Sequence, residues 1–161
     1  MEGSDFDEGE FFRAIAGSGA RVLLIGRRAM VAYGLPVLTA DYDLWIDAGD
    51  AEALNAALAP LGLRPSRPPD EARGTGRYVL QNDEHVDVLL SRSGMPVEGV
   101  RASFDEMWSR RRILRFDDRT SMAVPCLDDL ILTKRWAMRD KDVADIRLLQ
   151  ALKARLEGED S

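Results

Sequence analysis

The sequence predicts an α+β (mixed α/β) single domain, in which a mixed central sheet is flanked by helices and followed by a C-terminal helical pair. Three observations support this fold class. Short apolar runs bounded by turn residues recur before Pro125, helical periodicity dominates after it, and no linker or repeat divides the 161 residues. A chain of this length is one ordinary domain that can bury a core. We therefore predict one domain over 1–161, with a core over 20–124 and C-terminal helices over 125–157.

The first half alternates helix and strand signals. The clearest helix of this half is the one expected over 50–61, because its leucines recur at spacings of three and four residues before Gly62. The proline-rich stretch 64–76 is predicted to be a surface loop, since prolines break regular structure. The expected elements, in order, are a helix over 5–16, a strand over 21–25, a helix over 27–33, a strand over 42–46 and a helix over 50–61.

The second half begins with strands and ends with helices. Two strand-like runs flank the turn residues 82–84, which indicates a β-hairpin. The expected elements are strands over 77–81 and 85–90, a turn over 91–94, a helix over 104–109, strands over 111–116 and 122–124, and helices over 127–138 and 143–156 separated by 139–142.

Composition and charge exclude several classes of protein. A single cysteine, Cys126, excludes an internal disulfide and a zinc finger. The longest apolar runs are too short for a membrane span, and the N-terminus does not resemble a signal peptide, so we expect a cytoplasmic protein. A net charge of −6 argues against indiscriminate nucleic-acid binding, although Arg27–Arg28 and the arginines of 110–115 form local basic patches.

Three aspartates are the candidate metal ligands and catalytic residues. Asp41 and Asp43 lie at the start of the strand predicted over 42–46. In a strand, alternate side chains share a face and are spaced by roughly 6–7 Å along it. Two carboxylates at that spacing can hold one or two divalent ions. Asp87 lies within the apolar run 85–90, where a charged residue is costly unless it is paired, hydrogen-bonded or bound to a metal. The simpler interpretation is that Asp87 faces solvent on a one-sided strand.

The turn at Gly26 is a candidate phosphate site. A glycine between a strand and a helix lets the backbone approach a ligand, and the start of a helix favours an anion. Arg27 and Arg28 follow it and can add cationic contacts to a polyphosphate, although Arg27 can equally obstruct the pocket. Lys134 falls on the apolar face of the helix predicted over 127–138, where it can either reach a phosphate or extend past the core to solvent.

The ordered set of motifs resembles the nucleotidyltransferase superfamily with the polymerase-beta-like fold. It is most similar to the small bacterial branch of minimal nucleotidyltransferases and AbiEii-type toxins of toxin–antitoxin systems. The resemblance covers approximately residues 20–150. The motifs that carry it are Ile25-Gly-Arg-Arg-Ala-Met-Val-Ala-Tyr-Gly34, Thr39-Ala-Asp-Tyr-Asp-Leu44, His85-Val-Asp-Val-Leu-Leu90 and the segment from Leu130 to Ile146, which contains Arg139-Asp-Lys-Asp-Val-Ala-Asp.

The resemblance implies a nucleotidyltransferase fold and a role for each matching residue. Asp41 and Asp43 would bind both Mg²⁺ ions, and Asp87 would be the third ligand and the base or orienter of the incoming hydroxyl. Gly26 and its neighbour would hold the β- and γ-phosphates of an NTP, with Thr39 and Lys134 lining the nucleotide pocket. Arg139, Asp142 and Asp145 match a helix-to-helix signature whose role is either a structural salt bridge or functional.

The leading hypothesis is Mg²⁺-dependent transfer of a nucleoside monophosphate from an NTP, such as ATP, to a hydroxyl of RNA, a protein or a small molecule. A toxin–antitoxin component is one such role, and a partner protein or a second copy would complete the site. The alternative is a catalytically inactive binding or regulatory module. It is motivated by Arg27, where the family usually has glycine or serine, and by Val37, where many relatives have arginine. A third reading is a plain mixed-fold domain whose acids decorate the surface.

Overall fold

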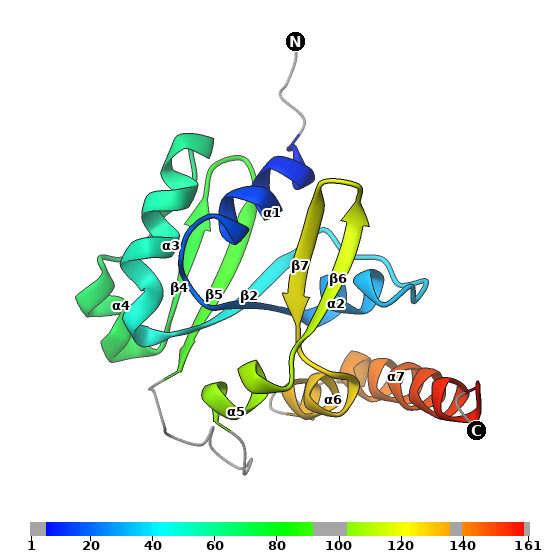
Figure 1. The fold of residues 1–161 in the computed structure, drawn as a ribbon. Helices are drawn as coiled ribbons and strands as arrows, with labels where there is room; N and C mark the ends of the chain where they lie inside the picture. The colour runs from blue at the N-terminus through cyan, green and yellow to red at the C-terminus, as the bar shows by residue number, and fades with distance from the viewer. Residues whose placement is uncertain (1–5, 92–102, 136–139, 160–161) are drawn as a thin grey trace.

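The computed structural model describes residues 6–91, 103–135 and 140–159 (Figure 1). Within them, the strands form a five-stranded sheet and a separate two-stranded hairpin. The large sheet is mixed, because β2 and β5 run parallel while its other neighbouring strands pair antiparallel. Its order is β1 (Val22–Ile25), β2 (Tyr42–Asp47), β5 (His85–Ser91), β4 (Arg77–Gln81) and β3 (Arg64–Pro65), and the hairpin consists of β6 (Arg112–Asp117) and β7 (Thr120–Val124).

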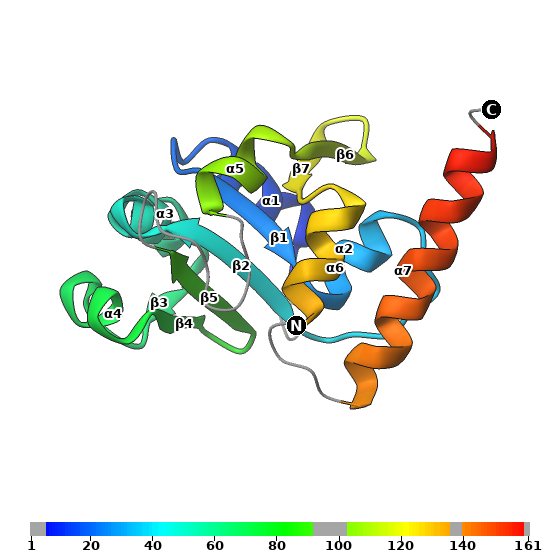
Figure 2. The same cartoon turned by 90° about the horizontal axis from the view of Figure 1, so that it is seen from below.

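Helices surround this sheet and extend beyond its β1 edge. In Figure 2, α6 and α7 lie beside α2, and the C-terminal part of α7 extends past the rest of the chain. The mixed sheet with flanking helices and a C-terminal helical pair is the predicted fold class. The helices are α1 (Glu8–Ala16), α2 (Gly26–Ala32), α3 (Ala51–Leu58), α4 (Pro69–Thr75), α5 (Phe104–Ser109), α6 (Leu127–Arg135) and α7 (Asp140–Glu159), with 3₁₀ turns at Ala48–Asp50 and Ala59–Leu61.

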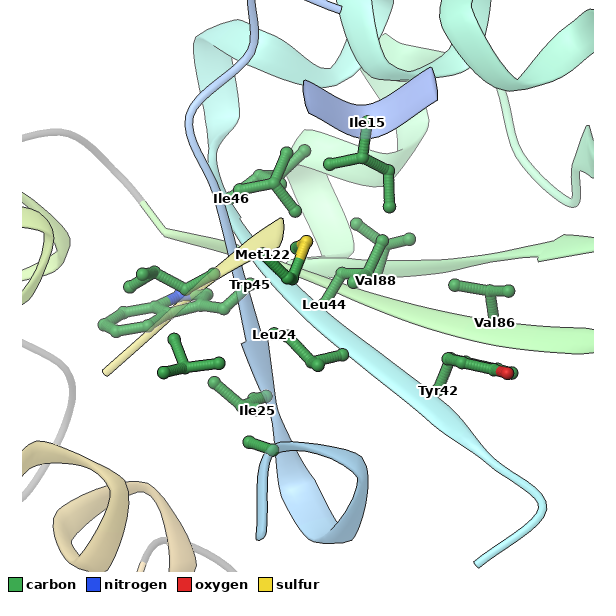
Figure 3. Packing of buried hydrophobic residues seen from close by; sticks show 14 of the residues in the cluster. Ile15, Leu24, Ile25, Tyr42, Leu44, Trp45, Ile46, Val86, Val88 and Met122 are labelled. Atoms are coloured by element: carbon green, nitrogen blue, oxygen red, sulfur yellow. The ribbon is translucent and has the colours of Figure 1, made fainter. Parts of the chain in front are cut away.

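Strand β2 forms the centre of the core. Both faces of this strand are buried from Leu44 onward. Figure 3 shows Ile15 of α1 and Met122 of β7 among the side chains packed around Leu44. On β2, Trp45 packs edge-to-face against Phe104 of α5, with the ring centroids 5.0 Å apart. A strand covered on both faces is held rigidly, so the residues at its start have a fixed base.

The prediction that 64–76 form a surface loop is wrong. This stretch contains the short strand β3 and the helix α4. Pro69 is the first residue of α4, where proline is tolerated because the first turn needs no amide donor. Asp70 and Glu71 favour the helix start, and Gly76 ends it in a left-handed conformation with φ +82°. The prolines therefore start a helix instead of excluding one.

The other elements lie where they are predicted, with ends that differ by a few residues. The predicted turn 91–94 is described only at Ser91, which belongs to β5, and 92–94 lie outside the described residues. Helix α6 is described as far as Arg135, and α7 begins at Asp140 instead of 143. Among the helices that the structure describes, none is both long and apolar enough to cross a membrane.

Candidate active site

Asp43 and Asp87 lie side by side on the two parallel central strands. Their Cα atoms are register partners in the β2–β5 pair. Directly opposite residues on neighbouring strands have side chains on the same face at close distance, so the two carboxylates share one face of the sheet. Asp87, which the sequence places inside the apolar run 85–90, therefore lies on the strand next to the one that carries Asp43.

Gly26 adjoins Asp43 from the other side. Ile25, the residue before it, pairs with Asp43 across the antiparallel β1–β2 ladder. Gly26 has φ +71°, and a Cβ at this position would collide with the Asp43 carboxylate oxygen Oδ2. The turn therefore requires glycine twice, for its backbone conformation and for the space that Asp43 occupies. The Asp43 carboxylate fills the space that a side chain at Gly26 would take, so the turn and the carboxylate are in direct contact.

Asp87 has two neighbours, one arginine and one histidine, that the sequence did not indicate. The guanidinium Nη2 of Arg77 on β4 lies 3.5 Å from Asp87 Oδ1, and His85 Nε2 lies 3.4 Å from the same oxygen. His85 and Asp87 are two residues apart on β5 and share a face, while Arg77 reaches over from the neighbouring strand. The local alternation of β5 could have suggested His85, but Arg77 follows only from the pairing of β4 with β5.

Asp41 precedes β2 and is exposed. Its backbone amide donates a hydrogen bond to Thr39 Oγ1 over 3.1 Å, so Thr39 shapes the loop that leads into the strand. In the described part of the chain, no three histidine, cysteine or acidic side chains are arranged to hold one metal ion as they stand. Asp43 and Asp87, whose carboxylates share one face of the sheet, are suitable oxygen donors for a divalent cation, and Asp41 is the acid that would complete the predicted set.

Arg28 holds the loop before β2 from the side of α2. Its Nη2 donates to the Thr39 carbonyl over 3.2 Å, and its guanidinium lies 4.2 Å from the centre of the Tyr42 ring. Arg28 also forms an ion pair with Glu8 of α1 at 3.4 Å, and Tyr42 donates its hydroxyl to the same carboxylate. Burial, together with this hydrogen bond to Glu8, raises the pKa of Tyr42 above its ordinary value. Arg28 is therefore a packed connector between α1, α2 and β2.

Arg27 and Lys134 meet at one carboxylate of α7. Arg27 donates to both oxygens of Asp145, from Nε and Nη2 at 3.1 Å each, and Lys134 Nζ donates to Asp145 Oδ2 over 2.8 Å. Burial alone would raise the pKa of Asp145, but the hydrogen bonds from Arg27 and Lys134 outweigh it and lower that pKa. The hydrogen bond to Asp145 likewise raises the pKa of Arg27. Asp145 is therefore held as an anion beside the Gly26 turn.

The structure thus brings the predicted residues together in two groups. Gly26, Asp43 and Asp87 adjoin one another at the start of the parallel strands, with Asp41 in the loop just before them. Arg27 and Lys134 form a second group with Asp145, while Arg28 and Thr39 bridge the loop between the groups. Arg139, which belongs to the same helix-to-helix signature, lies outside the described residues.

A cavity of about 290 Å³ opens at the turn between β4 and β5. Carboxylates dominate its lining, so a cationic molecule is the kind of ligand that its charge favours. The lining includes Asp7, Glu10, Asp83 and Glu84, with Phe6 and Leu61 as its apolar part.

Solved structures of other proteins share the fold of this chain. No protein-family profile and no curated protein sequence matches the chain. A crystal structure assigned as a nucleotidyltransferase from Thermotoga maritima is 12% identical, with a TM-score of 0.56 over 92% of this chain and 89% of that one. The crystal structure of ANT(2″)-Ia in complex with adenylyl-2″-tobramycin is 14% identical, with a TM-score of 0.59 over 94% and 95% of the two chains. A solution structure of the same antibiotic-resistance factor is 13% identical, with a TM-score of 0.58 over 93% and 89%.

Proposed function

We propose that this chain, which has the nucleotidyltransferase fold, transfers a nucleoside monophosphate from an NTP to a hydroxyl acceptor. The acceptor oxygen forms a bond to the α-phosphorus, the bond from that phosphorus to the bridging oxygen breaks, and pyrophosphate leaves. The observation that carries the proposal is the position of Asp43, which lies between the Gly26 turn and Asp87. Two carboxylates on one face of the sheet, beside a backbone turn without a side chain, support metal-assisted transfer of a phosphate group.

Asp41, Asp43 and Asp87 are the residues that would hold Mg²⁺, as one ion or two. When bound, such ions neutralise charge on the phosphates and orient the attacking and leaving oxygens. Asp87 is the carboxylate that would orient the acceptor hydroxyl and take its proton. His85 and Arg77 keep that carboxylate in place, because both contact its Oδ1.

The second group of residues would bind the triphosphate. Gly26 would let the β- and γ-phosphates approach the backbone. Arg27 follows it directly, and Lys134 shares the Asp145 carboxylate with Arg27. Thr39 would line the nucleotide pocket, and Arg28 fixes the loop before Asp41 through the Thr39 carbonyl. A guanidinium offers paired donors to phosphate oxygens, while an ammonium acts as a point charge.

A cationic small molecule is one of the possible acceptors. The acidic cavity at the β4–β5 turn lies on the face of the sheet that α1 and Tyr42 share, whereas Asp43 and Asp87 lie on the opposite face, so the cavity does not by itself form the acceptor site. The complex of ANT(2″)-Ia with adenylyl-2″-tobramycin shows that this fold can handle such a molecule in another protein. RNA and protein hydroxyls remain acceptors to screen, and a toxin–antitoxin role would rest on one of them.

The direct test is a screen for pyrophosphate release from each of the four NTPs with Mg²⁺. Aminoglycosides, total RNA and total protein serve as separate acceptors. We expect release that depends on one acceptor class and disappears when Mg²⁺ is removed with a chelator. Acceptor-independent release of inorganic phosphate would instead identify an NTP hydrolase and contradict the proposal.

A catalytically inactive nucleotide-binding or partner-binding module is the second candidate. The observation that favours it is the pairing of Arg27 and Lys134 with Asp145, which engages both cations before any phosphate arrives. Calorimetric titration with NTP and Mg²⁺ distinguishes the two functions. Tight binding without pyrophosphate release in any acceptor screen supports the module, and binding together with release excludes it.

A further inference from the structure

Four ionisable side chains from three helices form a compact cluster beside the Gly26 turn. Arg27 comes from α2, Lys134 from α6, and Asp142 and Asp145 from α7. Lys134 Nζ lies 2.8 Å from Asp145 Oδ2 and 3.8 Å from Asp142 Oδ1. The lysine side chain is 6% exposed and each aspartate 1%, while Arg27 is 32% exposed. The cluster is therefore closed to solvent except on the arginine side.

The donors of Arg27 are directed at protein oxygens. Nε and Nη2 donate to the two oxygens of Asp145, and Nη1 donates to the Leu38 carbonyl over 3.2 Å. This is the planar, paired geometry with which an arginine binds either a carboxylate or a phosphate. Among the described residues, two cations and two carboxylates form the cluster, so each cation already has an anionic partner.

The apolar face of α7 sets the position of Asp145. Ile146, Leu149 and Leu152 are buried on that face, and Asp142 and Asp145 continue it toward the start of the helix. The carboxylate is thus carried to the cations by a helix whose docking has its own hydrophobic basis. A carboxylate that is carried by one helix and bound by two others can give way to another anion if its own helix shifts.

We propose that Asp145 is an internal competitor for the triphosphate: its carboxylate occupies Arg27 and Lys134, and an NTP must displace it to reach them. The inference rests on the proposed function, because it assigns those two cations to the phosphates. It makes Asp145 a positioning residue that sets how tightly the triphosphate is held. Displacement of the carboxylate also releases the first turns of α7 from α2 and α6.

Inorganic tripolyphosphate is the appropriate probe, because it contains the phosphates without base, sugar or acceptor. We expect the full-length variant Asp145→Asn to bind it about tenfold more tightly than the wild type in metal-free calorimetry, since one competing negative charge is removed. Loss of packing alone weakens binding and does not produce this gain. Adding Arg27→Met to Asp145→Asn should abolish the gain, which ties the effect to the cluster.

The chain contains a matched control pair. Asp129 of α6 is 4% exposed and binds Arg110 in the same two-bond geometry, at 2.9 and 3.0 Å. Asp129→Asn should leave tripolyphosphate affinity unchanged. An equal gain in Asp129→Asn would show a general charge effect and overturn the inference.

A measurement on the wild type keeps the inference testable if Asp145→Asn does not fold. Saturating tripolyphosphate should speed amide hydrogen exchange in residues 142–146 and leave α3 unchanged. Unchanged or slower exchange in 142–146 overturns the inference, as does tripolyphosphate binding by folded Asp145→Asn that is no tighter than wild type. If neither protein binds tripolyphosphate, the phosphate site of the proposed function fails with it, whereas a failure limited to Asp145 leaves NMP transfer standing.

Discussion

Gly26 is the residue on which the site depends most directly. Its positive φ and its contact distance to the Asp43 carboxylate are two separate constraints. Gly34 shares only the first, because it has φ +91° but open space where a Cβ would lie. The two glycines therefore allow backbone strain to be separated from displacement of Asp43.

We expect Gly26→Ala and Gly34→Ala each to lower the free energy of unfolding by about 1–2 kcal/mol, because alanine is strained at positive φ. Only Gly26→Ala should also weaken Mn²⁺ binding, since its methyl group pushes the Asp43 carboxylate away. Urea unfolding and Mn²⁺ titration by electron paramagnetic resonance measure the two effects. Equal Mn²⁺ affinity in both variants would show that Gly26 serves the turn alone.

The lowered pKa of Asp145 gives a pH dependence. A carboxyl group with a depressed folded-state pKa stabilises the protein above its unfolded pKa, and this contribution is lost as pH falls through the folded pKa. Arg27→Met removes one of the cations that lowers this pKa. The stability difference between wild type and Arg27→Met should therefore be largest near pH 7 and shrink below about pH 4, where aspartate ordinarily titrates. Urea unfolding across this range checks it, and a constant difference would contradict it.

The sequence indicated the candidate site residues more completely than the side chains that contact them. Asp41, Asp43 and Asp87 stood out because each is an acid at the start of, or inside, an apolar run. The contact of Arg77 with Asp87 could not be predicted, because it depends on the register of two strands. Asp145 was visible as part of a signature, but its bonds to Arg27 join positions more than a hundred residues apart.

Helix α7 lies close to where the sequence predicts a helix, over 143–156. The sequence predicted it from its periodicity, and its inward face combines leucines with the aspartates of the ion cluster. Helix α4 shows the opposite outcome, because prolines are read as breakers unless their position in the first turn is known. The prolines of 64–76 indicated a break in regular structure, but not that a helix begins at one of them.

Adjacent leucines of α7 test how firmly this helix is docked. Leu149 is fully buried, whereas Leu148 is 38% exposed. We expect Leu149→Ala to lower the free energy of unfolding by about 2–5 kcal/mol and Leu148→Ala to change it by less than about 1 kcal/mol. Chemical denaturation of both variants measures this. Similar small effects would mean that α7 contributes little to the folded domain, and its control of Arg27 and Lys134 would then lack a basis.

For the molecule as a whole, the order of the motifs predicted the fold better than any single motif did. A glycine turn, two spaced acids, a third acid on a later strand and a lysine-bearing helix predicted the fold that the structure shows. The geometry of the ion cluster and the partners of Asp87 required three-dimensional packing. The acceptor depends on surface chemistry that the fold leaves variable.

The central claim is that the α-phosphate of an NTP is transferred and that Asp43 is required. The most direct measurement compares NTPs labelled at the α- or γ-phosphate, incubated with Mg²⁺ and the acceptor panel, using wild type and Asp43→Asn. We predict acceptor labelling from the α-label alone, reduced at least about a hundredfold in Asp43→Asn because the carboxylate pair beside Gly26 is lost. Acceptor labelling from the γ-label, or undiminished α-labelling by Asp43→Asn, would contradict the account.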